Sequence, residues 1–205
     1  MITDRQRHGT GWESTLVNRV RAAALAGVHL VQVRERDLDA ASLTRLVTAC
    51  VESVRGTETR IVVNDRLDVA LAAGAHGVHL RGDSMPAERV RRVAGRPFLI
   101  GRSVHDRDEA IRVTEGSELD YLVFGTVFDS RSKSGSAPAG LDRLSAVTAA
   151  TRVPVLAVGG MTVERFASVV EAGAAGGAAI GLFADASADS LVERILALVK
   201  SARYS

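Results

Sequence analysis

Short runs of β-branched and other apolar residues alternate with longer amphipathic runs rich in Ala and Arg along the whole chain. The apolar runs contain few polar positions, a pattern typical of parallel strands that are covered on both faces. Strands are therefore predicted at 29–34, 60–64, 77–80, 98–102, 121–125, 153–160 and 176–183, with the end of another at the initial "MIT". Helices are predicted near 12–26, 39–55, 66–74, 86–94, 106–116, 140–150, 162–172 and 185–202.

These segments form eight strand–helix units if the short first one is counted. The units follow one another at about 20–30 residues, the repeat of an α/β barrel, with no Pro- or Ser-rich linker between them. The pattern predicts a closed (β/α)₈ TIM barrel rather than an open doubly wound sheet. We expect a single domain over residues 1–205 with a short first strand.

Composition narrows the class of protein. The chain has 46% hydrophobic and 24% charged residues, as expected for a globular domain. Its net charge is only +2, it has no long Lys/Arg run, and aromatic residues make up 4%, so nucleic acid is not an expected partner. No apolar run reaches the roughly 18 residues of a membrane span, and "MITDRQRHG" lacks a signal-peptide core. We expect a cytoplasmic protein that does not bind membranes, with Cys50 buried.

Polar residues gather at the predicted carboxyl ends of the strands, where barrel enzymes carry their sites. In "QVRER", Gln32, Arg34 and Arg36 alternate with other residues, so they share one face of an extended segment. Two neighbouring guanidiniums suit a phosphate, which they bind through paired hydrogen bonds. The alternative is an internal Arg–Glu network that supports the barrel.

"VVNDR" places Asn64 and Asp65 at another strand end, and "HLRGDS" adds Asp83. Mg²⁺ typically takes one or two carboxylates together with substrate phosphates, so Asp65 and Asp83 are candidate metal ligands. Asp65 could instead cap the helix that follows it.

Glycines at two later strand ends predict a phosphate site. Gly159 and Gly160 follow one strand and precede a helix, and Gly181 follows the next. Glycine lets the backbone approach a ligand closely, and barrels often bind phosphate at the loops after strands 7 and 8. The alternative is that these glycines only form tight turns.

A loop rich in hydrogen-bond donors contains Ser130, Ser132 and Lys133, and Ser103 ends a further strand. Hydroxyls and an ammonium beside arginines and a metal predict a diphosphate site. A diphosphate site and a separate monophosphate site predict an enzyme that joins two small phosphorylated molecules. Self-association into a homo-oligomer stays open. A nucleophilic pair of Ser103 and His105 is not expected, because the chain has no G-x-S-x-G elbow.

The motifs "QVRER", "VVNDRLDVALAAGAHGVHL", "IGRSVHDRDEA", "DYLVFGTVFDSRSKSG" and "PVLAVGGMTVERFASVVEAGAAGGAAI" resemble the thiamine phosphate synthase / TenI family over nearly the whole chain. The resemblance implies a (β/α)₈ barrel that joins hydroxymethylpyrimidine diphosphate to thiazole phosphate with Mg²⁺ and releases diphosphate. The positions that match the family's pyrimidine, metal, diphosphate and thiazole-phosphate residues are Gln32, Arg34, Asn64, Asp65, Ser103, Ser130, Ser132, Lys133, Gly159 and Gly160.

Several positions depart from the synthase pattern. Arg36 stands where the synthase usually has lysine, Asp83 comes one position before the metal position, now Ser84, and Gly181 replaces a serine. "GRSVH" and "RER" are instead similar to TenI, the thiazole tautomerase branch, whose catalytic histidine would fall at Thr126. Two alternatives to the synthase therefore stay open. One is a TenI-like tautomerase in which His105 or His79 replaces the missing base, and the other is a non-catalytic barrel that binds thiazole phosphate or thiamine phosphate.

Overall fold

A computed structural model describes residues 1–116, 118–130, 137–185, 190, 192, 193 and 195–198 of the chain. The strands are β1 (Leu30–Val33), β2 (Arg60–Asn64), β3 (Gly77–Leu80), β4 (Leu99–Val104), β5 (Tyr121–Gly125), β6 (Val155–Val158) and β7 (Gly176–Ala178). The α-helices are α1 (Trp12–Leu25), α2 (Ala40–Ser53), α3 (Leu67–Ala72), α4 (Ala87–Ala94), α5 (Arg107–Thr114), α6 (Gly140–Ala149), α7 (Val163–Glu171) and α8 (Gly181–Ala184), and a 3₁₀ helix η1 spans Arg5–Arg7.

The strands form one seven-stranded sheet in the order in which they occur along the chain, from β1 to β7. The pairs β1–β2, β2–β3, β4–β5, β5–β6 and β6–β7 are parallel. The alternation of strands and helices predicted from the sequence is confirmed, and so is the α/β class.

The predicted first strand is reduced to a single bridge. Ile2 pairs in parallel with Gln32, Gln32 N–H donates to the carbonyl of Met1 at 2.9 Å, and Thr3 N–H donates to the carbonyl of Gln32 at 3.0 Å. The predicted strand at 176–183 is also shorter than expected. It ends at Ala178, and the segment that begins at Gly181 is helical.

Local sequence signals explain where several helices begin. The side chain of Asp39 accepts a hydrogen bond from Ser42 N–H at 2.9 Å, and Asp106 accepts one from Glu109 N–H at 2.7 Å. Each carboxylate satisfies a backbone donor that the first turn of a helix leaves without a partner. The helices α2 and α5 therefore start one residue after an aspartate.

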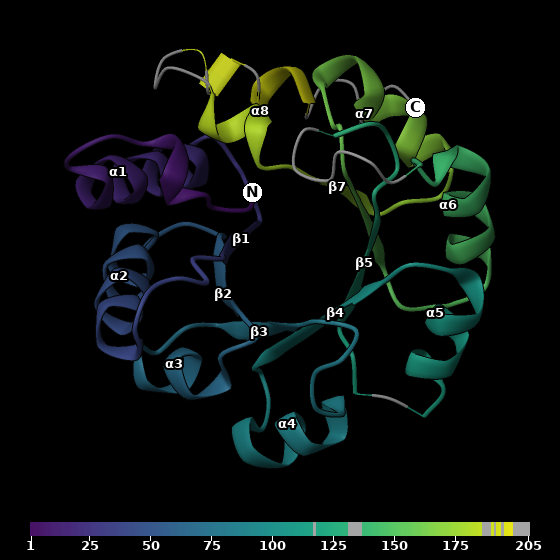
Figure 1. Ribbon diagram of the computed structural model, residues 1–205, viewed down its shortest axis with the longest axis horizontal. Helices are drawn as coiled ribbons and strands as arrows, with labels where there is room; N and C mark the ends of the chain where they lie inside the picture. The colour runs from purple at the N-terminus through teal and green to yellow at the C-terminus, as the bar shows by residue number, and fades with distance from the viewer. Residues whose placement is uncertain (117, 131–136, 186–189, 191, 194, 199–205) are drawn as a thin grey trace. The chain divides into compact units, whose positions relative to one another are not determined.

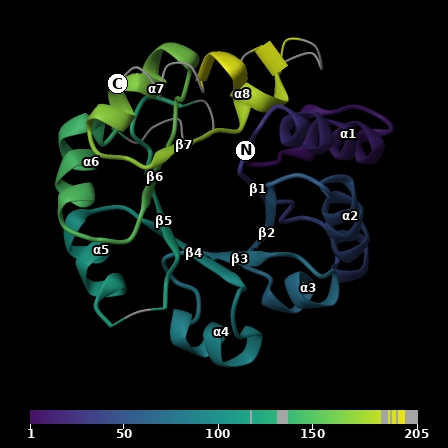
Figure 2. The ribbon, with the colours of Figure 1, turned by 180° about the vertical axis from the view of Figure 1, so that it is seen from behind.

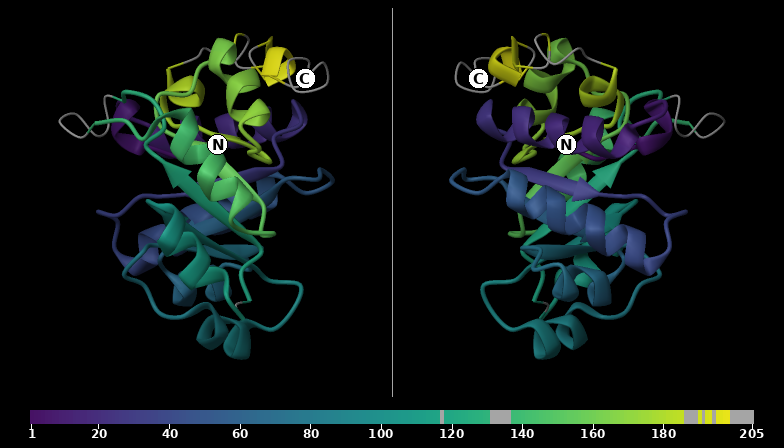
Figure 3. Two further views of the ribbon diagram at one scale, coloured as in Figure 1. Left: turned by 90° about the vertical axis from the view of Figure 1, so that its right-hand side faces the viewer. Right: turned by 90° about the vertical axis from the view of Figure 1, so that its left-hand side faces the viewer.

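The chain divides into two compact units, which we describe separately. The first comprises Met1–His79, Arg96–Leu99 and Ile180–Ala197. In it, α1 and α2 lie side by side, and α2 packs against β2 (Figure 1; Figure 3, right). Its largest fully buried side chains belong to Leu16, Val20, Val31, Val33, Val47, Ile61 and Val62.

Cys50 lies on the buried face of α2 in the first unit, as predicted. Burial raises the pKa of its thiol to about 12, so the thiol stays protonated at neutral pH and acts as a small apolar group.

The second unit comprises Leu80–Gly95, Ile100–Ala179 and Leu198–Ser205. In it, α6 packs against β5 and β6 and also contacts α5 and α7 (Figure 2). Its largest fully buried side chains belong to Phe124, Ile100, Leu122 and Leu144. Within the described part of the chain, no helix is long and apolar enough to cross a membrane.

Gly101 of β4 lies against the ring of Tyr121, its register partner on β5. A side chain at this position would overlap that ring, so we expect Gly101→Ala to lower the free energy of unfolding by about 1–3 kcal/mol through overpacking. Chemical denaturation of the purified variant measures this loss. Gly176→Ala is the matched control, because its Cβ would meet only Leu156 Cδ2 at 3.5 Å. Equal stability of the two variants would contradict the prediction.

Candidate functional site

The structure describes most of the site residues predicted from the sequence, and each of these lies at the carboxyl end of a strand. Gln32 and Ser103 are the second-last residues of β1 and β4, and Asn64 ends β2. The predicted site residues in the segments that follow the strands are Arg34, Arg36, Asp65, Asp83, Ser130, Gly159, Gly160 and Gly181. Ser132 and Lys133 lie outside the described residues.

In the first unit, three polar side chains share one face of the sheet. Gln32 Nε2 donates to Asn64 Oδ1 at 3.0 Å, and Asn64 pairs in register with His79 on β3. His79 is only 2% exposed, and burial, together with the nearby charge of Arg34, lowers the pKa of its imidazole to about 4. His79 is therefore neutral at neutral pH. From the sequence it was only one of two candidate bases for the tautomerase alternative.

Arg34 and Arg36 form a pair of neighbouring cations. Burial of the half-buried Arg34 lowers its pKa below the usual range, and the charge of Arg36 adds to that shift. Arg36 is exposed and lies in a turn, so the extended conformation does not continue to it. Among the residues that the structure describes, neither guanidinium has a hydrogen-bond or ion-pair partner. The carboxylates of Asp4 and Glu35 act on Arg34 only at longer range. Two adjacent guanidiniums without a direct partner in the described part of the chain suit a multiply charged anion.

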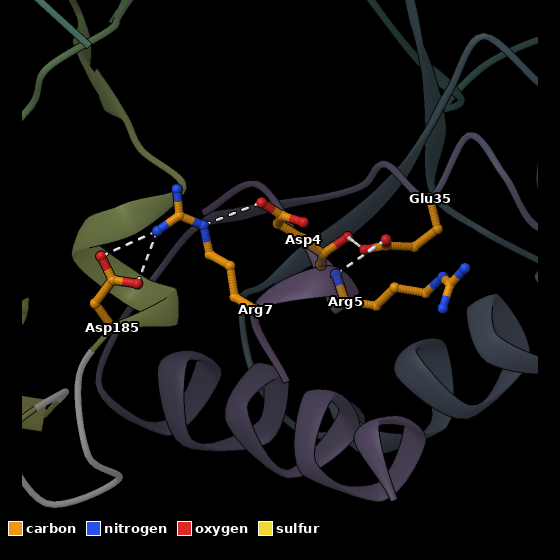
Figure 4. A network of polar contacts seen from close by, with 6 residues as sticks. Asp4, Arg5, Arg7, Glu35 and Asp185 are labelled. Atoms are coloured by element: carbon orange, nitrogen blue, oxygen red, sulfur yellow. Dashed lines mark hydrogen bonds and ion pairs between the residues drawn. The ribbon is translucent and has the colours of Figure 1, made fainter. Parts of the chain in front are cut away.

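Glu35 lies between these arginines in sequence but binds elsewhere. Its carboxylate accepts hydrogen bonds from Thr3 Oγ1 at 2.5 Å and from Arg5 N–H at 3.0 Å (Figure 4). The Thr3 hydroxyl also accepts a hydrogen bond from the backbone N–H of Arg34 at 3.0 Å. The alternative of an Arg–Glu network therefore does not account for Arg34. Glu35 instead fixes the backbone that carries the two cations.

Arg7 lies beside Gly181, a position that the sequence did not indicate. Its guanidinium donates to Asp4 Oδ2 at 3.0 Å and to Asp185 Oδ1 at 2.8 Å (Figure 4). A Cβ at Gly181 would lie 3.2 Å from Asp185 Oδ2 and 3.7 Å from Arg7 Nη1. The ion pairs therefore connect the N-terminal segment to the start of α8.

Asp65 adopts an uncommon backbone conformation. Its φ is 54°, and no other non-glycine residue has a positive φ in the described ranges. The backbone N–H of Asp65 donates to the carbonyl of His79 at 2.9 Å, which holds this conformation. The N-cap of α3 is Arg66, so the interpretation of Asp65 as the helix cap is wrong. Left-handed conformations of non-glycine residues occur often at functional sites.

In the second unit, the loop that contains Asp83 is fixed by two arginines. Asp83 forms a hydrogen-bonded ion pair with Arg81. The hydrogen bond from Arg81 is the largest cause of the lowered pKa of Asp83. The buried Arg102 donates to the carbonyls of Gly82, Ser84 and Met85 at 3.0, 2.9 and 3.2 Å. Asp83 is therefore exposed and ionised, and a cation at this loop would compete with Arg81 for it.

The carboxylates that the structure describes decide how Mg²⁺ could bind. No group of three or more His, Cys, Asp or Glu side chains that could hold a metal occurs among the described residues. A protein cage is not required for Mg²⁺, which is commonly bound by one or two carboxylates and the phosphates of a substrate. Asp65 in the first unit and Asp83 in the second are each a carboxylate of the kind that Mg²⁺ takes together with the phosphates of a ligand.

The glycine pair after β6 is packed closely against the segment after β5. Gly159 has a φ of 102° and Gly160 a φ of 60°. A Cβ at Gly160 would lie 2.8 Å from Phe128 Cβ, and Phe128 N–H donates to the carbonyl of Gly159 at 3.2 Å. Only glycine fits both the backbone conformation and the close approach. This loop leads into α7, whose N-terminus favours an anion.

These features define a class: parallel α/β proteins whose strand ends present cations, glycine loops and a carboxylate to phosphorylated small molecules. The chain belongs to the TMP-TENI family, thiamine monophosphate synthase, which it matches over residues 1–183.

The names of similar proteins support the family membership. The chain is 39% identical to a putative thiamine-phosphate synthase of Geobacter sulfurreducens, with 97% of this chain and 92% of that protein covered. It is 36% identical to the thiamine-phosphate synthase of Roseiflexus castenholzii, with coverage of 99% and 88%. Among solved structures, thiamine phosphate pyrophosphorylase from Pyrococcus furiosus superimposes with a TM-score of 0.84 at 28% identity, covering 99% of this chain and 94% of that one.

Burial raises the pKa of Glu35 above its ordinary 4.5, although its hydrogen bonds with Thr3 and Arg5 oppose the shift. The folded protein thus holds this proton more tightly than the unfolded chain, and stability falls as pH rises from the ordinary pKa through the raised one. Glu35→Gln cannot ionise and escapes this loss. We expect the melting temperature of Glu35→Gln, relative to wild type, to rise between about pH 4 and about pH 7.

Asp37→Asn is the matched control, because the hydrogen bond from Arg5 lowers the pKa of this exposed carboxyl. Its contribution to stability is present above the ordinary pKa and is lost only as pH falls below it, so the difference between Asp37→Asn and wild type should stay nearly constant between about pH 4 and about pH 7. Differential scanning calorimetry at several pH values measures both differences. A difference for Glu35→Gln that does not change with pH would contradict the prediction.

Proposed function

We propose that this chain is a transferase that condenses hydroxymethylpyrimidine diphosphate with thiazole phosphate, giving thiamine phosphate and diphosphate. The relatives that are named as thiamine-phosphate synthases or as thiamine phosphate pyrophosphorylase support the proposal. The observation that carries it in this chain is the pair Arg34 and Arg36, two neighbouring cations whose guanidiniums have no hydrogen-bond or ion-pair partner among the described residues.

We propose the following division of roles. Gln32 and Asn64, already hydrogen-bonded to each other, orient the pyrimidine. The residues that bind the diphosphate are Arg34, Arg36, Ser103, Ser130, Ser132 and Lys133. Gly159, Gly160 and Gly181 bind the phosphate of the thiazole. We also propose that the chain forms a closed (β/α)₈ barrel, a single domain over residues 1–205. The seven strands that pair in chain order in one sheet support this architecture.

Mg²⁺ would be held by Asp65, with Asp83 as a second carboxylate. When bound, the ion neutralises charge on the diphosphate. The left-handed backbone at Asp65 supports this assignment, because it is a conformation that the hydrogen bond to His79 has to maintain. Asp83 can join only by leaving Arg81.

The residues of the chain then assist the departure of diphosphate. As the bond between the pyrimidine methylene and the diphosphate oxygen breaks, negative charge grows on that oxygen and its neighbours. Donors from Arg34 and Arg36 bind this charge more strongly in the transition state than in the ground state, which accelerates the step. The thiazole nitrogen forms the new bond to the methylene carbon, at a position set by its phosphate. We place the reaction in the cytoplasm, where a free cysteine such as Cys50 remains reduced.

The tautomerase alternative lacks a suitable base. Thr126 occupies the position of the TenI histidine and cannot transfer protons as an imidazole does. His79 is buried with a pKa of about 4, which makes it a weak base, and His105 Nδ1 lies 3.3 Å from the carboxylate of Glu109 on the surface. These three positions favour the synthase over the isomerase.

The direct test supplies the purified protein with both substrates and Mg²⁺ and follows products by chromatography. We expect thiamine phosphate and diphosphate in equal amounts. Isomerisation of thiazole phosphate without a pyrimidine substrate would support the tautomerase instead. Binding of either phosphate compound without any turnover would support the non-catalytic alternative.

Asp65→Asn tests the metal assignment without changing the backbone, because asparagine tolerates the left-handed region as aspartate does. We expect turnover at saturating substrate to fall by about 10²-fold, the loss typical of one electrostatic catalytic group. The Mg²⁺ concentration for half-maximal activity should rise. Asp68→Asn, which removes an exposed carboxylate paired with Arg66, is the control and should leave both quantities unchanged. An Asp65→Asn enzyme with wild-type turnover and Mg²⁺ dependence would contradict the assignment.

A further inference from the structure

Arg165 on α7 has no assigned role, yet its guanidinium touches two loops of the second unit. Its Nη1 donates to the carbonyl of Gly160 at 2.7 Å. Its Cζ atom lies 4.8 Å from the centre of the Phe128 ring, within the range of a cation–π interaction. One side chain therefore connects the glycine loop after β6 to the segment after β5.

The two loops are also joined by their backbones. Val127 N–H donates to the carbonyl of Val158 at 2.9 Å, and Phe128 N–H donates to the carbonyl of Gly159 at 3.2 Å. Neither bond involves the carbonyl of Gly160, which is the group that Arg165 binds. The guanidinium thus holds a carbonyl that these backbone hydrogen bonds leave without a donor.

The orientation of this peptide decides where its donor points. In a planar trans peptide the N–H points opposite to the carbonyl, so a Gly160 carbonyl turned toward Arg165 directs the N–H of Met161 away from it. The N–H groups of Gly160 and Met161 have no acceptor among the residues that the structure describes. Both donors are available to an anion.

Gly160 also gives the loop freedom that a side chain would remove. Glycine adopts positive and negative φ with similar ease, so the Gly160–Met161 peptide can rotate unless it is held. A rotation of this peptide would turn a carbonyl, instead of an N–H, toward a bound phosphate. The hydrogen bond from Arg165 opposes this rotation, and the Phe128 ring keeps the guanidinium in place.

We propose that Arg165 is a positioning residue for the monophosphate site: it orients the Gly160–Met161 peptide so that its N–H faces the phosphate of the thiazole substrate. The proposal rests on the proposed function for the identity of that substrate. The chemistry of the site, in which backbone donors bind a phosphate monoester, does not depend on the reaction that follows.

Calorimetric titration with inorganic phosphate tests the proposal without any need for turnover. We expect Arg165→Ala to weaken phosphate binding by about tenfold, as for one lost charge-assisted hydrogen bond, while binding of pyrophosphate with Mg²⁺ changes less than about twofold. Arg165→Lys keeps a donor and the charge and should recover part of the affinity. Arg143→Ala on α6 is the matched control, an exposed arginine with no hydrogen bond or ion pair to the described residues.

Phe128→Leu supplies a second, independent variant. It removes the aromatic face beneath the guanidinium and should weaken phosphate binding less than Arg165→Ala does. The double variant should bind phosphate no more weakly than Arg165→Ala alone, because both changes act through the same peptide. Additive losses would mean that Phe128 acts separately from Arg165 and would overturn the proposed coupling.

The outcomes separate this inference from the proposed reaction. Wild-type phosphate affinity in Arg165→Ala would overturn the inference, and so would equal losses for phosphate and pyrophosphate together with a lower melting temperature. If the wild-type protein binds phosphate with the predicted dependence on Arg165 but makes no thiamine phosphate, the proposed reaction fails and the inference holds. If it makes thiamine phosphate and the Michaelis constant for thiazole phosphate is unchanged in Arg165→Ala, the inference alone fails.

Discussion

Parallel pairing of the strands is the constraint on which the other features depend, because it directs the carboxyl ends of paired strands to the same edge of a sheet. In the first unit this register brings Gln32 to Asn64 and Asn64 beside His79. In the second, it pairs Gly125 of β5 with Val158 of β6, so the loops that follow both strands start together. Polar residues far apart in the sequence become neighbours for this reason.

The arginines of this edge fall into two kinds. Arg7, Arg102 and Arg165 donate to carboxylates or backbone carbonyls of the protein and hold loops in place. Arg34 and Arg36 have no such partner in the described structure, and the pKa of Arg34 is lowered by burial and by its neighbour. An anion that binds this pair would therefore relieve repulsion as well as gain hydrogen bonds. The supporting arginines define the shape of the loops, whereas the pair provides attraction for the ligand.

Apolar runs and strand-end polar residues were enough to predict the strands, most helices and the location of the candidate residues, because hydrophobic periodicity and parallel topology are local signals. Long-range contacts could not be predicted in this way. Glu35 contacts Arg5, 30 residues away, and Arg7 contacts Asp185, 178 residues away. Arg165 contacts Phe128, 37 residues away, and a glycine with a positive φ. Asp65 illustrates the same limit. The sequence placed it beside a helix start, but only the backbone shows that Arg66 is the cap.

We propose that the chain has two phosphate sites of different chemistry, a metal-dependent diphosphate site and a metal-free monophosphate site. Calorimetric titration of the wild-type protein with pyrophosphate, with and without Mg²⁺ and with and without saturating inorganic phosphate, tests it most directly. We expect that pyrophosphate binds tightly only with Mg²⁺ and that phosphate does not displace it from that site. Competition between the two anions for one site, or pyrophosphate binding that is indifferent to Mg²⁺, would mean that the two sites do not exist as proposed.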